Sequence, residues 1–235
     1  MKTLVILGAG TGGTAMAWRL RRALSERDWH IVVIDRDDAH LYQPGLLFIP
    51  FGLDEVSDDL RARSALMPAG VDLRLCGAER VDPDTREVHL RDGDTVRYDL
   101  LIVATGTRVA PEATPGLTDP GWYEHAFDFY TLEGAQGLRG ALEKFKGGRL
   151  VVNIAEMPIK CPVAPLEFAF LADAFFEERG LRDDVEITYV TPLSGAFTRP
   201  VAARTLGDML ERRRISVVPD FALASADHAA RTITA

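Results

Sequence analysis

The feature that most constrains this chain is a glycine-rich turn directly after its first apolar segment. Thr3–Leu7 is a short apolar run, the turn from Gly8 to Gly13 follows it, and apolar residues then recur at helical spacing as far as Leu24. The run predicts a buried strand, and the later spacing predicts a helix. Ile31–Ile34 is a second β-branched run, which completes a βαβ unit. These segments predict a parallel sheet in an α/β protein.

The spacing of the glycines indicates what the turn binds. Gly8, Gly10 and Gly13 stand where the strand turns, where the backbone approaches a pyrophosphate, and where the helix packs on the strand. Asp35 lies 22 positions after Gly13, where its carboxylate can accept hydrogen bonds from a ribose diol. We therefore predict a dinucleotide site, with Arg36 as a further candidate beside it. The alternatives are a tight turn in another α/β protein and, for Asp35, a helix cap or a solvated loop acid.

Composition and charge exclude several classes of protein. The chain has 235 residues, 47% of them hydrophobic, with 35 acidic against 27 basic side chains and a formal net charge of −8. This balance excludes intrinsic disorder and gives no basic footprint for nucleic acid. No apolar stretch approaches the roughly 18 residues of a spanning helix, so we expect a soluble, cytoplasmic chain. Two cysteines, 85 positions apart, exclude a disulfide framework and a four-ligand zinc site, and we predict no metal site.

The rest of the chain reads as two αβ units. Prolines and glycines concentrate between Ala110 and Gly121, which predicts the passage between two domains. We predict an FAD-binding first domain over 1–113 and a second over 114–235, as tandem Rossmann-like folds with the second incomplete. The further predicted strands are 71–76, 99–104, 150–155, 185–190 and 215–218, with a hairpin over 86–98, a strand pair within 222–235, and helices over 132–145, 163–179 and 201–213.

The strand over 99–104 bears on which dinucleotide is bound. It follows the hairpin and ends in Ala104-Thr105-Gly106. This arrangement resembles that of flavoproteins with two dinucleotide sites, in which such a turn passes close to the flavin nucleotide. The resemblance favours FAD over NAD. The alternative for Thr105-Gly106 is an ordinary strand-to-loop turn.

The second αβ unit lacks both devices for binding a dinucleotide. Its first turn, from Asn153 to Pro158, has no glycine, and the following strand ends in Thr191-Pro192 instead of an acid. A Cβ at a glycine position obstructs the approach of backbone to a pyrophosphate. We therefore do not predict a pyridine nucleotide at this unit.

Cys161 stands where the second glycine turn would be. The neighbouring Lys160 and the predicted helix start, whose first turn can accept Pro162, both favour the thiolate. The alternative is a small buried hydrophobe, the usual fate of a free cysteine and the one we predict for Cys76. Glu167, six positions further on, is either a proton relay or an acid stabilised near a helix N-terminus.

Four segments together resemble sulfide:quinone oxidoreductases, over essentially the whole chain. They are residues 5–13, 42–45, 104–106 and 157–167. The resemblance implies that FAD takes two electrons from sulfide through a cysteine pair, one of which is persulfidated, and that the electrons pass to membrane quinone. It implies Cys161 as the first redox cysteine, Glu167 as an acid that handles protons, and Pro44 in the segment near the flavin ring. The candidate cofactor-binding residues are Gly8, Ala9, Gly10, Thr11, Gly12, Gly13, Asp35, Arg36, Gln43, Pro44, Ala104, Thr105 and Gly106.

The sequence departs from that family in two ways. Some members carry a further cysteine near residues 124–130, where this chain has His125, Phe127 and Asp128. The chain also stops near Thr232, which is midway through the second domain of the family. We therefore expect the N-terminal part of a longer enzyme, unable to turn over alone. The full-length protein would lie at the inner membrane through its C-terminal part, and a homo-oligomer stays open.

Two other functions stay open at this point. An NADH:quinone or ferredoxin-type flavin reductase would need a nicotinamide site in the second unit, where the glycines are absent. A non-catalytic nucleotide-binding module would bind an adenine nucleotide without redox chemistry. A response of the flavin to NADH would favour the first of these, and a persulfide at Cys161 would exclude the second.

Overall fold

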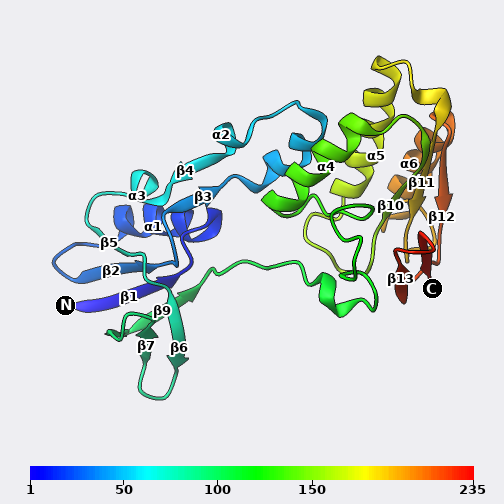
Figure 1. Ribbon diagram of the computed structural model, residues 1–235. Helices are drawn as coiled ribbons and strands as arrows, with labels where there is room; N and C mark the ends of the chain where they lie inside the picture. The colour runs from blue at the N-terminus through cyan, green and yellow to red at the C-terminus, as the bar shows by residue number, and fades with distance from the viewer. The chain divides into compact units, whose positions relative to one another are not determined.

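Two groups of residues pack separately in the computed structural model, which describes residues 1–235 (Figure 1). The first unit contains residues 1–42 and 56–108, and the second contains residues 43–55 and 109–235. The sequence places 43–55 in the first domain, but these residues pack with the second unit. The physical reason is Phe51, whose ring lies 4.9 Å from that of Phe168 and 5.6 Å from that of Phe175.

The first unit is built on a four-stranded parallel sheet in the order β5-β2-β1-β9. Its strands are β1 (Lys2–Leu7), β2 (Trp29–Ile34), β5 (Val71–Arg74) and β9 (Leu100–Val103). Both faces of the two central strands are buried, which is why their sequences are continuous apolar runs instead of alternating ones. The α/β fold predicted from the sequence is confirmed.

Each face of this sheet has its own cover. Helix α1 (Thr11–Ala23) packs its buried Ala17 against one face. An antiparallel sheet of β6 (Ala78–Asp82), β7 (Glu87–Leu90) and β8 (Thr95–Arg97) covers the other. The chain between β2 and β5 adds short elements that the sequence did not predict. They are β3 (Ala39–Leu41), paired with β4 (Leu60–Ala62), and the single turns α2 (Val56–Asp59) and α3 (Arg63–Leu66).

The second unit repeats the βαβ arrangement around a three-stranded parallel sheet. The strands are β10 (Gly148–Asn153), β11 (Val185–Val190) and β12 (Ile215–Val218), in that order. The core lies between one face of this sheet and the helices α4 (Leu132–Lys144), α5 (Ala164–Glu178) and α6 (Pro200–Arg212). The remaining elements are η1 (Gln43–Leu47), η2 (Ile49–Phe51), η3 (Pro111–Ala113), η4 (Arg182–Asp184), β13 (Ser225–Asp227) and β14 (Thr232–Thr234). None of the helices combines the length and the apolarity that a bilayer span requires.

Helix α4 begins at the residue that the sequence predicts as its cap. The Thr131 Oγ1 accepts a hydrogen bond from Gly134 N at 3.0 Å. We expect Thr131→Ala to lower the free energy of unfolding by about 1 kcal/mol, because it leaves this helix N–H without its partner. Thr131→Ser keeps the hydroxyl and should stay close to the parent. Urea unfolding of the two variants measures the difference, and equal midpoints for alanine and serine would contradict the assignment.

Candidate functional site

The glycine turn of the first unit is shaped by close backbone contacts. Gly8 has φ of +95°, and a Cβ there would lie 2.3 Å from the carbonyl oxygen of Ala104. A Cβ on Gly13 would lie 1.7 Å from the carbonyl oxygen of Gly8. Neither position can hold a side chain while β1, α1 and β9 keep their packing. These two glycines are therefore required by the protein's own fold.

The other two glycines of the turn face open space. A Cβ on Gly10 would meet no heavy atom within 4 Å, and one on Gly12 would meet only the Ala104 Cβ at 3.9 Å. Gly10 is the N-cap of α1, and no side chain caps the helix. The first N–H groups of a helix have no partner within it, so they are available to an anion here. The turn thus offers a cradle that a pyrophosphate would fit and that a Cβ would narrow.

Asp35 ties the end of β2 to this turn. Its Oδ2 accepts a hydrogen bond from Ala9 N at 2.7 Å, and its Oδ1 accepts one from Arg36 N at 2.7 Å. A carboxylate has about four acceptor positions, so capacity for a ribose hydroxyl is left. The Arg36 side chain turns to Asp37, at 3.1 Å, and is largely exposed. Arg36 therefore supports Asp35 through its backbone and not through its guanidinium.

The turn over 104–106 lies beside the glycine turn within the same unit. Ala104 N donates to Leu7 O at 2.7 Å, and the Thr105 Cα lies 3.0 Å from the position of a Cβ on Gly8. Gly106 has φ of +71°, a left-handed conformation that favours glycine. The structure thus brings together the predicted residues of the first unit, because the carboxyl ends of parallel neighbours meet at one edge.

Arg63 is a residue of this region that sequence reasoning missed. Its Nε lies 3.3 Å from Asp35 Oδ2, and its Nη1 pairs with Asp37. Burial alone would raise the pKa of Asp37, but the N–H of Ala39 and the Arg63 guanidinium hold that pKa below its usual value. No local sequence signal marks this arginine, because the unpredicted β3–β4 pair is what brings it to the end of β2.

We expect Arg63→Met to destabilise the first unit by about 1–2 kcal/mol at neutral pH, since Asp37 is partly exposed. A carboxyl group with a lowered folded pKa stabilises the fold above its unfolded pKa, and this stabilisation is lost as pH falls through the folded value. The difference between the variant and the parent should therefore shrink below pH 3.8, the usual value for aspartate.

Urea unfolding across pH tests this, with Arg61→Met as the matched control. Arg61 is exposed and donates only to the carbonyl oxygens of Ser57 and Leu60. An Arg63→Met deficit that is independent of pH would contradict the ion-pair explanation.

In the second unit, Cys161 is exposed and lies between β10 and α5. Its exposure rules out the alternative of a small buried hydrophobe. The helix begins at Ala164 with Val163 as its N-cap, so Cys161 precedes the cap by two residues and Pro165, not Pro162, occupies the first turn. Cys161 has φ of +52°, and its carbonyl oxygen accepts a hydrogen bond from Ala164 N at 3.1 Å.

Polar side chains from three segments surround the cysteine loop. Lys160 Nζ donates to Gln43 Oε1 at 3.1 Å and lies 5.6 Å from the centre of the Tyr130 ring. Burial lowers the pKa of Lys160, while the negative charges of Asp128 and a Cys161 thiolate act in the opposite direction. Lys160 thus lies within electrostatic reach of the thiol. Of the two predicted residues in the 43–55 segment, Gln43 contacts this loop and Pro44 lies beside it in η1.

Glu167 lies in the first turn of α5 and is exposed. Burial, followed by the charges of Cys161 and Glu167, raises the pKa of Tyr130. Glu167 therefore also lies within electrostatic reach of the loop. Cys76 differs from Cys161, because it is half-buried and its pKa is raised by burial and by its hydrogen bond with Asp92.

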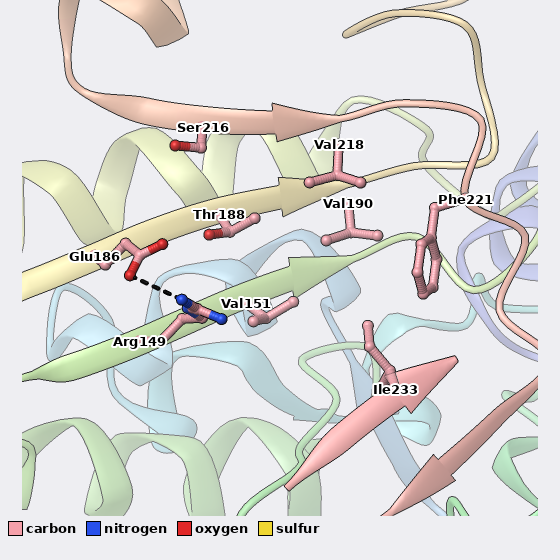
Figure 2. Close-up of a pocket in the computed structure, with 9 residues that line it drawn as sticks. All are labelled: Arg149, Val151, Glu186, Thr188, Val190, Ser216, Val218, Phe221 and Ile233. Carbon is pink, nitrogen blue, oxygen red and sulfur yellow. Dashed lines mark hydrogen bonds and ion pairs between the residues drawn. The ribbon is translucent and has the colours of Figure 1, made fainter. Parts of the chain in front are cut away.

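A separate cavity of about 320 Å³ lies on the face of β10–β12 that the helices leave open (Figure 2). Val151, Val190 and Val218 line it, and an ion pair between Arg149 and Glu186, at 3.2 Å, crosses two of its strands. It contains neither cysteine and no glycine turn. The cavity is therefore not part of the candidate site.

The chain matches the pyridine nucleotide-disulphide oxidoreductase family over residues 2–152. It is 27% identical over 214 residues to the mitochondrial sulfide:quinone oxidoreductase of Mus musculus, covering 91% of this chain and 47% of the mouse protein. It is 26% identical over 229 residues to the sulfide-quinone reductase of Aquifex aeolicus, covering 94% of this chain and 51% of that protein. The crystal structure of the Aquifex aeolicus sulfide:quinone oxidoreductase matches with a TM-score of 0.83 at 22% identity, over 97% of this chain and 53% of that one.

The chain belongs to the pyridine nucleotide-disulphide oxidoreductase family, and its fold is that of the Rossmann-like flavoproteins. Within that family it is sulfide:quinone oxidoreductase-like, as the sequence resemblance predicts. The chain spans about half the length of the curated relatives it matches.

Proposed function

We propose that the protein is an FAD-dependent oxidoreductase of the sulfide:quinone oxidoreductase type, in which sulfide is oxidised at Cys161. The observation that supports this best is the exposed Cys161 at the β10–α5 turn, where a second dinucleotide site would need glycines. The open glycine cradle of the first unit supports the nucleotide part of the proposal. Sulfide-oxidising relatives that match across both units support the choice of substrate.

The first unit would hold the adenine nucleotide end of the cofactor. We assign the pyrophosphate to Gly10, Thr11 and Gly12 at the start of α1, and the ribose diol to Asp35. Gln43, Pro44, Thr105 and Gly106 are proposed to contact the flavin. When bound, FAD supplies an acceptor for two electrons and passes them on to quinone.

The second unit would supply the sulfur chemistry. In the net step, an S–S bond forms between sulfide and the Cys161 Sγ, two protons are released, and the two electrons are accepted by the flavin. Lys160 favours the thiolate that this step needs, because a thiolate and not a thiol is the nucleophile. Glu167, exposed in the first turn of α5, is proposed to accept one of the protons.

The test is anaerobic addition of sulfide, or of NADH, to the FAD-loaded chain. We expect sulfide to bleach the flavin absorbance and NADH to leave it unchanged. We expect about one reduction per chain and not sustained turnover, because the chain has only one exposed thiol. Bleaching by NADH would favour a pyridine nucleotide-dependent reductase instead. A bound flavin that responds to neither would favour a nucleotide-binding module.

A further inference from the structure

The backbone of Cys161 is held in a conformation that a cysteine rarely adopts. Its φ of +52° lies in the left-handed region, which costs a residue with a Cβ about 1 kcal/mol or more. Such a conformation persists only where the surroundings fix it. The loop from Asn153 to Ala164 contains no regular secondary structure that could do so. Side chains from elsewhere in the second unit must therefore contribute.

Tyr130 supplies such a contact. Its Oη–H donates to the carbonyl oxygen of Cys161 at 3.3 Å, and Ala164 N donates to the same oxygen at 3.1 Å. A carbonyl oxygen has two lone pairs, so both donors can be accommodated. One donor belongs to the helix start, and the other comes from a residue 31 positions earlier in the chain. The peptide group of Cys161 is thus fixed from two sides.

Tyr130 is itself fixed. Its ring stacks on that of Phe129, with centroids 4.9 Å apart and planes at 25°. Its backbone N–H donates to Asp128 Oδ1 at 2.9 Å, next to the cap of α4. Burial and the negative charges of Cys161 and Glu167 raise the pKa of its phenol, so the hydroxyl stays protonated and remains a donor at neutral pH.

We propose that Tyr130 is a positioning residue for Cys161, whose hydroxyl fixes the Cys161 peptide group and thereby keeps Sγ presented for reaction with sulfide. The proposal rests on the proposed function only in taking Cys161 as the reacting thiol. The hydroxyl does not touch the sulfur and takes no part in bond making. Its removal should therefore loosen the loop and slow the chemical step without changing how the thiol ionises.

A matched control lies in the same unit. Tyr189 on β11 is fully buried, and its hydroxyl has no hydrogen-bond partner. Its pKa is raised by burial and by the charge of Tyr130, so the two phenols lie within electrostatic reach of each other. Tyr130→Phe and Tyr189→Phe remove the same atom, but only the first breaks a hydrogen bond to the cysteine loop.

The test measures two properties of each variant. Hydrogen–deuterium exchange reports the order of residues 154–164 and needs no cofactor or activity. Anaerobic mixing of the FAD-loaded chain with sulfide reports the limiting rate of flavin reduction. For Tyr130→Phe we expect exchange to be about fivefold faster and the limiting rate about three- to tenfold lower, as the net contribution of one hydrogen bond implies. Tyr189→Phe should match the parent in both.

The charged groups around the loop are unchanged in Tyr130→Phe. These are Lys160, Glu167 and Asp128. The pH midpoint for reaction of Cys161 with a thiol reagent should therefore equal that of the parent, with Cys76→Ser as background so that one thiol reacts. A shifted midpoint would mean that Tyr130 tunes the charge of the sulfur, which would contradict positioning.

The outcomes separate this proposal from the proposed function. Faster exchange in Tyr130→Phe, with no flavin reduction by sulfide even in the parent, would leave the loop contact intact and reject the activity. Unchanged exchange would overturn the positioning role whatever the activity. Reduction by sulfide at the parental rate in Tyr130→Phe, despite faster exchange, would overturn it as well.

Discussion

Cys161→Ser is expected to abolish reduction of the flavin by sulfide. Serine fills the same space on an exposed loop, so the fold should be unaffected. Its hydroxyl is neither ionised near neutral pH nor able to form an S–S bond, so the step that connects sulfide to the flavin has no acceptor sulfur. We expect the rate to fall on the order of 10³-fold or more, as with other lost nucleophiles. Anaerobic stopped-flow absorbance of the FAD-loaded chain measures it.

Cys76→Ser is the control for this change. Cys76 is half-buried in the first unit, and burial together with its hydrogen bond to Asp92 raises its thiol pKa. It is therefore a poor thiolate at neutral pH. Its replacement should leave flavin reduction by sulfide close to the parental rate. If Cys161→Ser kept more than about a tenth of that rate, the cysteine would not be the entry point for electrons.

The second large effect is expected within the glycine turn, where neighbouring positions should fail in different ways. In Gly13→Ala the new Cβ would lie 1.7 Å from the carbonyl oxygen of Gly8, a backbone atom that cannot move without disturbing β1. We expect a loss of about 3 kcal/mol in the free energy of unfolding, which is the upper end for an overpacked site. FAD binding should be lost with the fold of the turn.

Gly12→Ala should instead fold normally and bind FAD poorly. The nearest atom to its Cβ is the Ala104 Cβ at 3.9 Å, an ordinary contact, and alanine favours the helix that begins here. The methyl group would occupy the space assigned to the pyrophosphate. We expect at least about a tenfold loss in FAD affinity at unchanged stability. Urea unfolding and flavin fluorescence titration separate the two variants. FAD affinity equal to the parent in Gly12→Ala would place the pyrophosphate elsewhere.

The sequence predicts the parts of the fold whose signals are local. The run Thr3–Leu7, the glycine turn and Asp35 follow one another in a single βαβ unit, so strand, helix and sheet direction can be read within about 35 residues. The same holds for Thr131, whose type and position predict the start of α4 that the structure shows. The boundaries of the elements differ from the predicted ones by one or two residues in most cases.

The contacts that the sequence could not predict join distant segments. Phe51 carries residues 43–55 into the second unit because its ring packs with those of Phe168 and Phe175, more than 100 positions away. Arg63 reaches Asp35 only through the short β3–β4 pair. Tyr130 reaches the Cys161 carbonyl across 31 positions. None of these residues belongs to a motif, and their partners become visible only once the chain is folded.

The most direct test of the account is the site of sulfur addition. The FAD-loaded chain is mixed with sulfide under anaerobic conditions, free thiols and persulfides are alkylated, and the peptides are analysed by mass spectrometry. We expect one extra sulfur atom on the peptide that contains Cys161, in proportion to the flavin reduced, and none on the Cys76 peptide. Flavin reduction with no sulfur added to Cys161, or failure of the chain to bind FAD, would contradict the account.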